Sequence, residues 1–524
     1  MRKSRLLLVV LAALALPALA FATEINIRMA VNPDTLDPTL VYTGDVNFIT
    51  KMLFVNLCDF DETRAVPTPD LAKSWEVSKD GLVWTFHLRN DVQWTNGRPV
   101  TARDVEYSMK RILDPATASP LGFYMYMIKN SKAVNTGKSK DMDSVGIKAL
   151  DDWTIQFTLD KPLGFFPTQI RTVAFAAPKE AIDTFGARWF EPPNIISNGP
   201  YMLQSWKQND RLVFVKNPNY YDAKNVKIDK VTVFVVTDDS TAMAMYEAGQ
   251  LDTTSVPSGD IDRVAKDPVL SKQTRSVPQL ISYMFQFNVT QPPMDNVNVR
   301  KALAAALDKE SIVKYVTKGG QVAMDTVTPF GAFGAVPKAA HIGIPFDPAA
   351  ARGYLAKAGY PGGKGLPQIT LNFNTSELNQ AVAQAAQQMW KKNLGIDVQL
   401  KNIEGKVYWD AITSGNLQFW RMGVNADVPD ADAFVYSTGH TTDSDRILKW
   451  QRKDFDAIVE KARSEPDPEV RKQLYIQAEK IMDQDEAVVI PIYSYAYVAI
   501  TKPTLNRQYS SLMADTIKNW SVTQ

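Results

Sequence analysis

Cysteine and histidine are scarce in this chain, which has one cysteine and three histidines in 524 residues. A lone Cys58 cannot form an intramolecular disulfide, and we expect it to be a small buried hydrophobe. His87, His341 and His440 stand far apart and match no close metal-ligand spacing such as H-E-x-x-H. The sequence therefore predicts neither a bound metal nor a cofactor.

Catalytic motifs are also missing. There is no G-x-S-x-G elbow, and the run Gly362-Gly363-Lys364-Gly365 lacks the G-x-x-x-x-G-K-[ST] register of a phosphate-binding loop. We read that run as a loop following Gly359. The chain is therefore predicted not to be an enzyme, with a hydrolase built from distant residues as a minor alternative.

The chain has no excess of charge of either sign, with 58 Lys and Arg against 57 Asp and Glu. Removing residues 1–22 leaves 55 basic residues against 57 acidic ones, a net charge of −2. So balanced a composition gives no electrostatic basis for binding DNA, RNA or anionic lipid. We expect no nucleic-acid partner.

Residues 1–22 match a secretory signal peptide. They contain a basic segment, an apolar core and an A-x-A cleavage site, which are Arg2, Lys3 and Arg5, then Leu6 to Leu16, then Ala20-Phe21-Ala22. Pro17 interrupts the apolar run, which disfavours a retained membrane anchor. The cleavage point has no cysteine, so we expect no lipidation there. We expect a periplasmic protein without a direct membrane anchor, with a mature chain that begins near Thr23.

About 500 residues are too many for one core, so two or three domains are expected. In the first half, Trp84–Leu88 alternates as a strand and Thr101–Asp104 matches a capping box. Strand-rich runs follow at Lys207–Val215 and Val231–Val236. Between 240 and 315 the pattern predicts helices at Thr241–Glu247 and Arg300–Leu307 around a strand at Leu280–Phe287.

The second half alternates helices and strands. The predicted elements are helices at Ala349–Ala358, Ala381–Leu394, Phe455–Arg463 and Pro468–Met482, and strands at Ile369–Phe373, Ile396–Leu400 and Ala487–Ile492. Gly395 suits the left-handed cap of a helix. Pro491 inside the last strand suits a sheet edge or a crossing point between two lobes. These elements predict an α/β fold.

The segment from Arg421 to Asp427 is the most informative for function. A guanidinium and a carboxylate flank a possible strand that contains Gly423. This arrangement suits a zwitterionic, extended ligand such as a short peptide.

Several motifs, in order along nearly the whole mature chain, together resemble the extracytoplasmic solute-binding proteins of peptide-type ABC transporters. They are Trp84-Thr85-Phe86-His87-Leu88-Arg89, Trp94-x-Asn96-Gly97-x-Pro99-Val100-Thr101-Ala102-x-Asp104-Val105, Asn198-Gly199-Pro200-Tyr201, Asn217-Pro218-x-Tyr220-Tyr221, Asn298-Val299-Arg300-Lys301-Ala302-Leu303 and Trp390-Lys391-Lys392-Asn393-Leu394-Gly395. The C-terminal half is most similar to oligopeptide-binding proteins, through Phe373-Asn374-Thr375-Ser376 and Arg421-x-Gly423-x-x-Ala426-Asp427.

The resemblance implies a bilobed periplasmic-binding-protein fold with a two-strand hinge and an extra subdomain on the first lobe. The implied division places lobe I at 23–58, 181–284 and 491–524, the appended subdomain at 59–180 and lobe II at 285–490. The implied partners are a short peptide ligand and an inner-membrane ABC transporter permease, and the protein is expected to be a monomer.

The resemblance also implies the site residues. Asp427 would receive the ligand's α-ammonium, Arg421 would meet a carboxylate, and Gly423, Val424 and Asn425 would pair with the ligand backbone. Tyr42, Thr43 and Gly44 match the family's second peptide-flanking segment. Asn379 stands where relatives often have histidine. Tyr493 and Tyr495 either line the cleft or pack beneath it.

Two features leave alternatives open. Relatives often have an aromatic residue at the position of Val424, and some have cysteine at that of Asn425, which weakens inferences about ligand length. Proteins of this fold also bind non-peptide solutes, including a nickel complex, haem, glutathione, an opine or an oligosaccharide, and the 11 Trp residues could stack on sugars. A chaperone-like periplasmic protein is a third interpretation.

Overall fold

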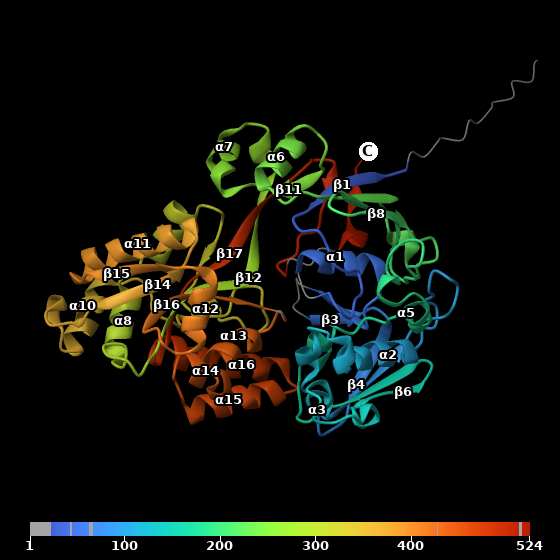
Figure 1. Cartoon of the computed structure of the whole chain (residues 1–524). Helices are drawn as coiled ribbons and strands as arrows, with labels where there is room; N and C mark the ends of the chain where they lie inside the picture. The colour runs from blue at the N-terminus through green and yellow to red at the C-terminus, as the bar shows by residue number, and fades with distance from the viewer. Residues whose placement is uncertain (1–21, 42–43, 62–65, 427, 513–515, 524) are drawn as a thin grey trace, which may run out of the picture.

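The chain folds into two lobes that lie side by side (Figure 1). The computed structural model describes residues 22–41, 44–61, 66–426, 428–512 and 516–523. The predicted signal peptide therefore lies almost wholly outside the described residues. The bilobed α/β fold predicted from the resemblance is confirmed.

One large mixed sheet runs through both lobes. Within the described residues it has 11 strands, in the order β15-β14-β16-β12-β17-β11-β1-β10-β9-β8, with β13 attached to β17. The strands are β1 (Glu24–Met29), β8 (Tyr201–Lys207), β9 (Arg211–Lys216), β10 (Lys230–Val235), β11 (Thr253–Ser255), β12 (Thr274–Phe287), β13 (Val322–Ala323), β14 (Ile369–Asn374), β15 (Val398–Ile403), β16 (Phe419–Asn425) and β17 (Val489–Thr501).

The two longest strands, β12 and β17, connect the lobes at the centre of Figure 1. Thr274–Pro278 pairs with Ala496–Ile500 on the side of β11, and Ser282–Gln286 pairs with Val489–Ser494 on the side of β16. The register shifts between these two blocks, between Pro278 and Ser282. A break in the ladder at this point loosens the pairing where the lobes meet, which suits the two-strand hinge.

The lobe on the right of Figure 1 carries the appended subdomain. Its helices include α1 (Gly44–Leu53) and α5 (Lys179–Phe185), whereas α6 (Asp239–Glu247) and α7 (Ile261–Lys266) lie at the top of Figure 1, above β12 and β17. The subdomain contains a four-stranded sheet in the order β4-β5-β7-β6. Its elements are β2 (Cys58–Asp61), β3 (Val66–Pro69), β4 (Ala72–Val77), β5 (Val83–Leu88), α2 (Ala102–Leu113), α3 (Ser131–Asn135), β6 (Ile147–Asp151), β7 (Thr154–Thr158) and α4 (Phe166–Ile170).

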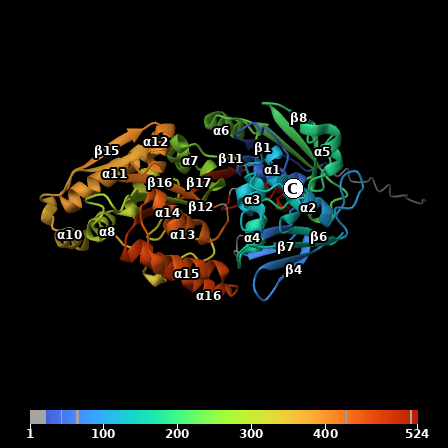
Figure 2. The same cartoon turned by 60° about the horizontal axis from the view of Figure 1, so that its bottom comes forward.

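The lobe on the left of Figure 1 is richer in helices. Figure 2 shows that α13 and α14 lie on the side that faces the subdomain. The helices are α8 (Val297–Ala305), α10 (Pro348–Lys357), α11 (Glu377–Leu394), α12 (Gly405–Thr413), α13 (Asp432–Gly439), α14 (Thr441–Ile447), α15 (Lys453–Ser464) and α16 (Pro468–Glu479).

The hydrophobic clusters largely follow the two lobes. One cluster joins the first lobe and its subdomain, includes Leu53, Phe86 and Phe214, and also takes in Val428 of the second lobe. Two clusters fill the second lobe, around Trp390 and around Tyr475. Apart from the contact at Val428, each lobe can thus move as a unit without opening its own core.

Cys58 is fully buried in the first lobe, as the sequence predicts, and its thiol contacts the carbonyl oxygen of Pro167 at 3.1 Å. Burial raises the pKa of the Cys58 thiol well above its ordinary value. Among the described helices, none combines the length and apolarity that a membrane crossing requires.

The strand-rich run Lys207–Val215 is confirmed and contains a turn, because β8 ends at Lys207 and β9 begins at Arg211, with Asn209 at φ +57° between them. Pro491 pairs with Met284 of β12 on one side of β17, and on the other side the strand pairs of β17 are at Tyr493 and Ser494, with β13, and at Ala499–Thr501, with β11. At Pro491 itself that other side has no paired strand among the described residues, and a register shift next to Pro491 accommodates its missing N–H. Its place at a crossing point between lobes stays a prediction.

Candidate ligand-binding site

Strand β16 has one partly unpaired edge. On one side, Phe419–Asn425 pairs with β12 along its whole length. On the other side, β14 pairs with β16 only at Asn372 and Trp420. Beyond that pair, Gly423–Asn425 therefore has no strand partner on this side among the described residues, and such an edge can accept an added strand.

Arg421 lies beside this edge with neutral partners. Its guanidinium contacts the Tyr495 hydroxyl, donates to Asn374 Oδ1 at 3.4 Å and lies 4.7 Å from the centre of the Tyr283 ring. Within the described chain, its Nε has no hydrogen-bond partner. A half-buried guanidinium whose described contacts include no carboxylate can accept an anionic group of a ligand.

Glycine at 423 gives the guanidinium room. A Cβ at Gly423 would lie 3.1 Å from Arg421 Nη2, which is closer than most Cβ contacts in proteins. Residues two apart on a strand point to the same face. The missing side chain therefore lets Arg421 fold over its own strand toward Tyr495.

Asn379 joins the same network from helix α11. Its Nδ2 donates to the carbonyl oxygen of Asn374 at 3.1 Å and to Asn374 Oδ1 at 3.0 Å. Asn379 is buried. It therefore reaches Arg421 through Asn374, and its predicted ligand contact stays a prediction.

Tyr493 and Tyr495 occupy different positions. Tyr493 is fully buried and stacks on Tyr283, with ring centres 4.6 Å apart. Tyr495 is half-buried, and its hydroxyl contacts Arg421. The structure thus packs Tyr493 beneath the site and brings Tyr495 to the guanidinium.

Several predicted site residues lie outside the described residues. These are Asp427, Tyr42 and Thr43. Gly44 is the first residue of α1, in the other lobe from β16. Val424 is half-buried and Asn425 is exposed at the end of β16.

Sequence reasoning missed three residues that hold Arg421. They are Tyr283 on β12, Asn374 at the end of β14, and Tyr408 on α12, whose hydroxyl donates to the Arg421 carbonyl oxygen. Of the three, only Asn374 could have been found from the sequence, since it belongs to a motif quoted above. Nothing in the sequence distinguishes Tyr283 and Tyr408 from other aromatic residues, because only the folded sheet brings them close to Arg421.

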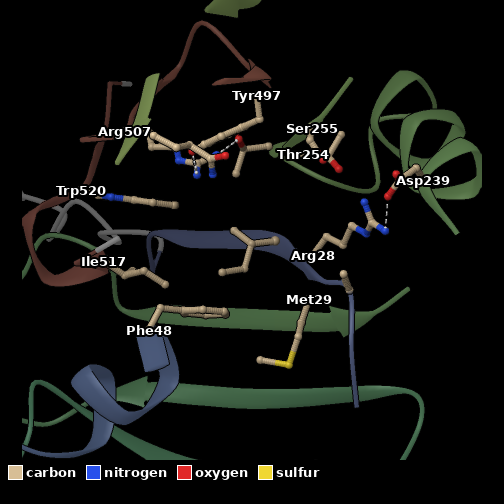
Figure 3. Close-up of a pocket in the computed structure, with 14 residues that line it drawn as sticks. Arg28, Met29, Phe48, Asp239, Thr254, Ser255, Tyr497, Arg507, Ile517 and Trp520 are labelled. Carbon is tan, nitrogen blue, oxygen red and sulfur yellow. Dashed lines mark hydrogen bonds and ion pairs between the residues drawn. The ribbon is translucent and has the colours of Figure 1, made fainter. Parts of the chain in front are cut away.

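A pocket of about 380 Å³ lies in the first lobe beside the hinge strands (Figure 3). Arg507 Nη1 donates to the Thr253 hydroxyl at 2.8 Å, and Nη2 donates to that of Tyr497 at 3.3 Å. At the other end Arg28 pairs with Asp239 at 2.6 Å. Tyr497 follows Tyr495 by two residues on β17, so this pocket and the Arg421 site lie along one strand.

The described residues contain no group of three or more His, Cys, Asp or Glu side chains that could hold a metal ion.

The family described as "Bacterial extracellular solute-binding proteins, family 5 Middle" matches residues 66–446. The chain belongs to this family. It is 33% identical to the oligopeptide-binding protein OppA of Bacillus subtilis over 481 residues, which cover 90% of this chain and 88% of that protein. It is also 33% identical over 477 residues to the periplasmic oligopeptide-binding protein OppA of Salmonella typhimurium, covering 90% and 86%.

This solute-binding protein is also similar to solved structures. The unliganded open form of the periplasmic murein tripeptide-binding protein MppA has a TM-score of 0.86 and 30% identity, with 96% of this chain and 98% of that chain covered. Haemophilus influenzae OppA in complex with RPPGFSPFR has a TM-score of 0.68 and 28% identity, with 96% and 99% covered. The TM-score is therefore higher against the unliganded open form of MppA than against the OppA–peptide complex.

Proposed function

We propose that this protein binds short peptides in the periplasm, between its two lobes, and delivers them to an ABC transporter permease for import. The unpaired edge of Gly423–Asn425 beside Arg421 carries the proposal. The peptide-binding names of the relatives support it. The protein is proposed to act as a monomer and as a binding protein without catalytic activity.

The edge of β16 suits recognition of a peptide backbone. Main-chain N–H and C=O groups pair in the same way whatever the side chains are, so strand addition gives affinity without sequence preference. Val424 and Asn425 would supply such groups, and Tyr42, Thr43 and Gly44 would flank the peptide from the other lobe. Asn379 and Tyr495 would support the site around Arg421.

The charged ends of the peptide would have separate partners. Arg421 offers two N–H groups to a carboxylate, in a geometry that favours paired hydrogen bonds. Asp427 would accept the α-ammonium, because lobe closure would otherwise bury that cation without a counter-charge. We also propose that residues 1–22 are removed as a signal peptide and that the chain passes between its lobes and subdomain at about 58, 180, 284 and 490.

Two measurements test the proposal. Mass spectrometry of ligand retained through native purification is expected to find peptides of a few residues; a metal complex, haem or sugar as the only ligand contradicts the proposal. Calorimetry on a free peptide and its N-acetylated form should then show weaker binding of the acetylated one. Asp427→Asn should lose about 2–5 kcal/mol of binding free energy for the free peptide.

A further inference from the structure

A second cavity opens next to the unpaired edge of β16. Its volume is about 520 Å³, and it is lined by Met422–Asn425 and by residues of α13 and α14. Phe123, Tyr124 and Gln169 of the appended subdomain also line it. We call this cavity the α13 pocket. Because it has walls from both lobes, it belongs to the cleft between them.

The α13 pocket lies where ligand side chains would enter. Met422 and Val424 alternate with Arg421 and Gly423 along β16, so they point to the opposite face of the sheet. Met422 and Val424 pack against the hydrophobic cluster that contains Phe434, on α13. A peptide paired with the β16 edge would send alternate side chains toward Arg421 and toward this pocket.

Among the described residues that line the pocket, one side chain is charged, and it is already neutralised. Asp432 is buried, and its Oδ1 accepts a hydrogen bond from the Tyr475 hydroxyl at 3.0 Å and lies 3.3 Å from Arg463 Nε. Burial raises the pKa of Asp432, although Arg463 opposes the shift. The Arg463 guanidinium in turn lies 4.0 Å from the centre of the Tyr436 ring.

The remaining lining is aromatic, aliphatic or uncharged. Phe123, Tyr124 and Tyr436 supply rings, and Val428, Ile447 and Leu448 supply aliphatic surface. Thr438 also lines the pocket; it is 3% exposed, and its hydroxyl has no hydrogen-bond partner within the described residues. A buried hydroxyl without a partner is unfavourable, so a polar group placed beside it would be stabilised.

We infer that the α13 pocket binds one large, uncharged side chain of the ligand, preferably an aromatic one. This inference rests on the proposed peptide-binding function. A charged side chain would lose its hydration and meet no free counter-charge among the described lining residues, while alanine would leave most of the volume unfilled. Backbone pairing would tolerate any sequence, and this pocket would add a preference at one position. Thr438 would favour tyrosine over phenylalanine there.

Calorimetry on short peptides with free termini tests the inference. Alanine peptides carry a single Phe, Tyr, Lys or Glu at each position in turn. At one position, Phe should bind at least about tenfold more tightly than Ala, while Lys and Glu gain nothing. Phe123→Ala should lower that ratio by about fivefold, since truncating a contacting aromatic residue costs this order of affinity.

The control for Phe123→Ala is Phe185→Ala. The two side chains are similarly exposed, at 44% and 42%, and Phe185 does not line the pocket. Phe185→Ala should leave the Phe-to-Ala ratio unchanged. If Phe123→Ala also leaves it unchanged, the pocket does not select the side chain.

Thr438→Val gives an independent test that does not depend on the subdomain. Because this hydroxyl has no described partner, its removal should not lower the melting temperature, but it should abolish any advantage of Tyr over Phe. A Tyr advantage that survives in Thr438→Val overturns the role of Thr438. If wild-type protein binds every peptide of the set equally well, the side-chain inference fails alone; if it binds none, the peptide-binding proposal fails with it.

Discussion

The backbone N–H of Gly164 donates a hydrogen bond to the carbonyl oxygen of Arg463 at 2.8 Å. Gly164 belongs to the subdomain of the first lobe, and Arg463 lies on α15 of the second. Beside them, the Arg471 guanidinium lies 4.5 Å from the ring centre of Phe165 and pairs with Asp430 at 2.5 Å. The lobes therefore touch at a point outside the hinge strands.

Gly164→Ala is expected to break this contact. A Cβ at Gly164 would overlap the carbonyl oxygen of Glu465, so the segments must separate. Without this contact, fewer interactions other than β12 and β17 restrain the lobes, and small-angle scattering should give a larger radius of gyration for the unliganded protein. Gly259→Ala is the control, because a Cβ there meets nothing within 4 Å. Identical scattering for both variants would mean that the contact does not restrain the lobes.

Tyr495→Phe should weaken peptide binding, whereas Tyr493→Phe should not. Tyr495→Phe removes a hydroxyl that contacts Arg421, and should weaken the binding of free short peptides by about 1–2 kcal/mol. Tyr493→Phe removes a buried hydroxyl without a described hydrogen-bond partner. It should leave affinity unchanged and stability unchanged or higher by up to about 1 kcal/mol. Calorimetry and thermal unfolding measure both; a large affinity loss in Tyr493→Phe would place that residue in the site.

Arg421→Gln should discriminate between ligand termini. It should cost about 2–5 kcal/mol for a peptide with a free C-terminal carboxylate. The loss should be much smaller for the C-terminal amide of the same peptide, which carries no negative charge. Arg103→Gln, whose side chain is 73% exposed, is the control for removing a positive charge. Equal losses for carboxylate and amide would assign Arg421 to a structural role.

The buried carboxyls of Glu479 and Asp483 predict a pH-dependent stability. Burial raises the pKa of Glu479 from 4.5 to about 7, and it also raises that of Asp483, which lies beside it. Between these two pH values the folded state retains a proton that the unfolded state releases. The free energy of unfolding should therefore fall as pH rises from about 4.5 to about 7.

Glu479→Gln removes this titration. The variant should be more stable than the wild type at pH 8, by about 1–3 kcal/mol, and should show a flatter pH profile. Urea unfolding at several pH values measures both effects. Glu469→Gln, an exposed residue of the same helix, is the control. An unchanged slope in Glu479→Gln would mean that the carboxyl is ionised in the folded protein.

The sequence predicted well those helix ends that are set by local signals such as a capping residue. Helix α2 follows the capping box at Thr101, and α11 ends at Gly395 with φ +74°, both as expected. The prediction of β12 began at Leu280, but the strand begins at Thr274. Its first residues, which include Pro278, are held by pairing with β17, and that partner lies more than 200 residues away.

The site was predicted only in part for the same reason. The resemblance pointed to Arg421, and β16 confirms the strand expected there. Its neighbours Tyr283, Asn374 and Tyr408 come from two other strands and a helix, and only the order β14-β16-β12 brings them together. The aromatic wall at Phe123 had no signal, because it comes from the subdomain.

The burial of Cys58 makes the native chain almost inert to thiol reagents. Two cysteines, one introduced on each lobe, would then be the reactive ones. A raised thiol pKa and complete burial leave little accessible thiolate at position 58. A donor and acceptor dye pair could be attached without first removing the natural residue. The fold thus offers a ready scaffold for a fluorescent reporter of its own closure.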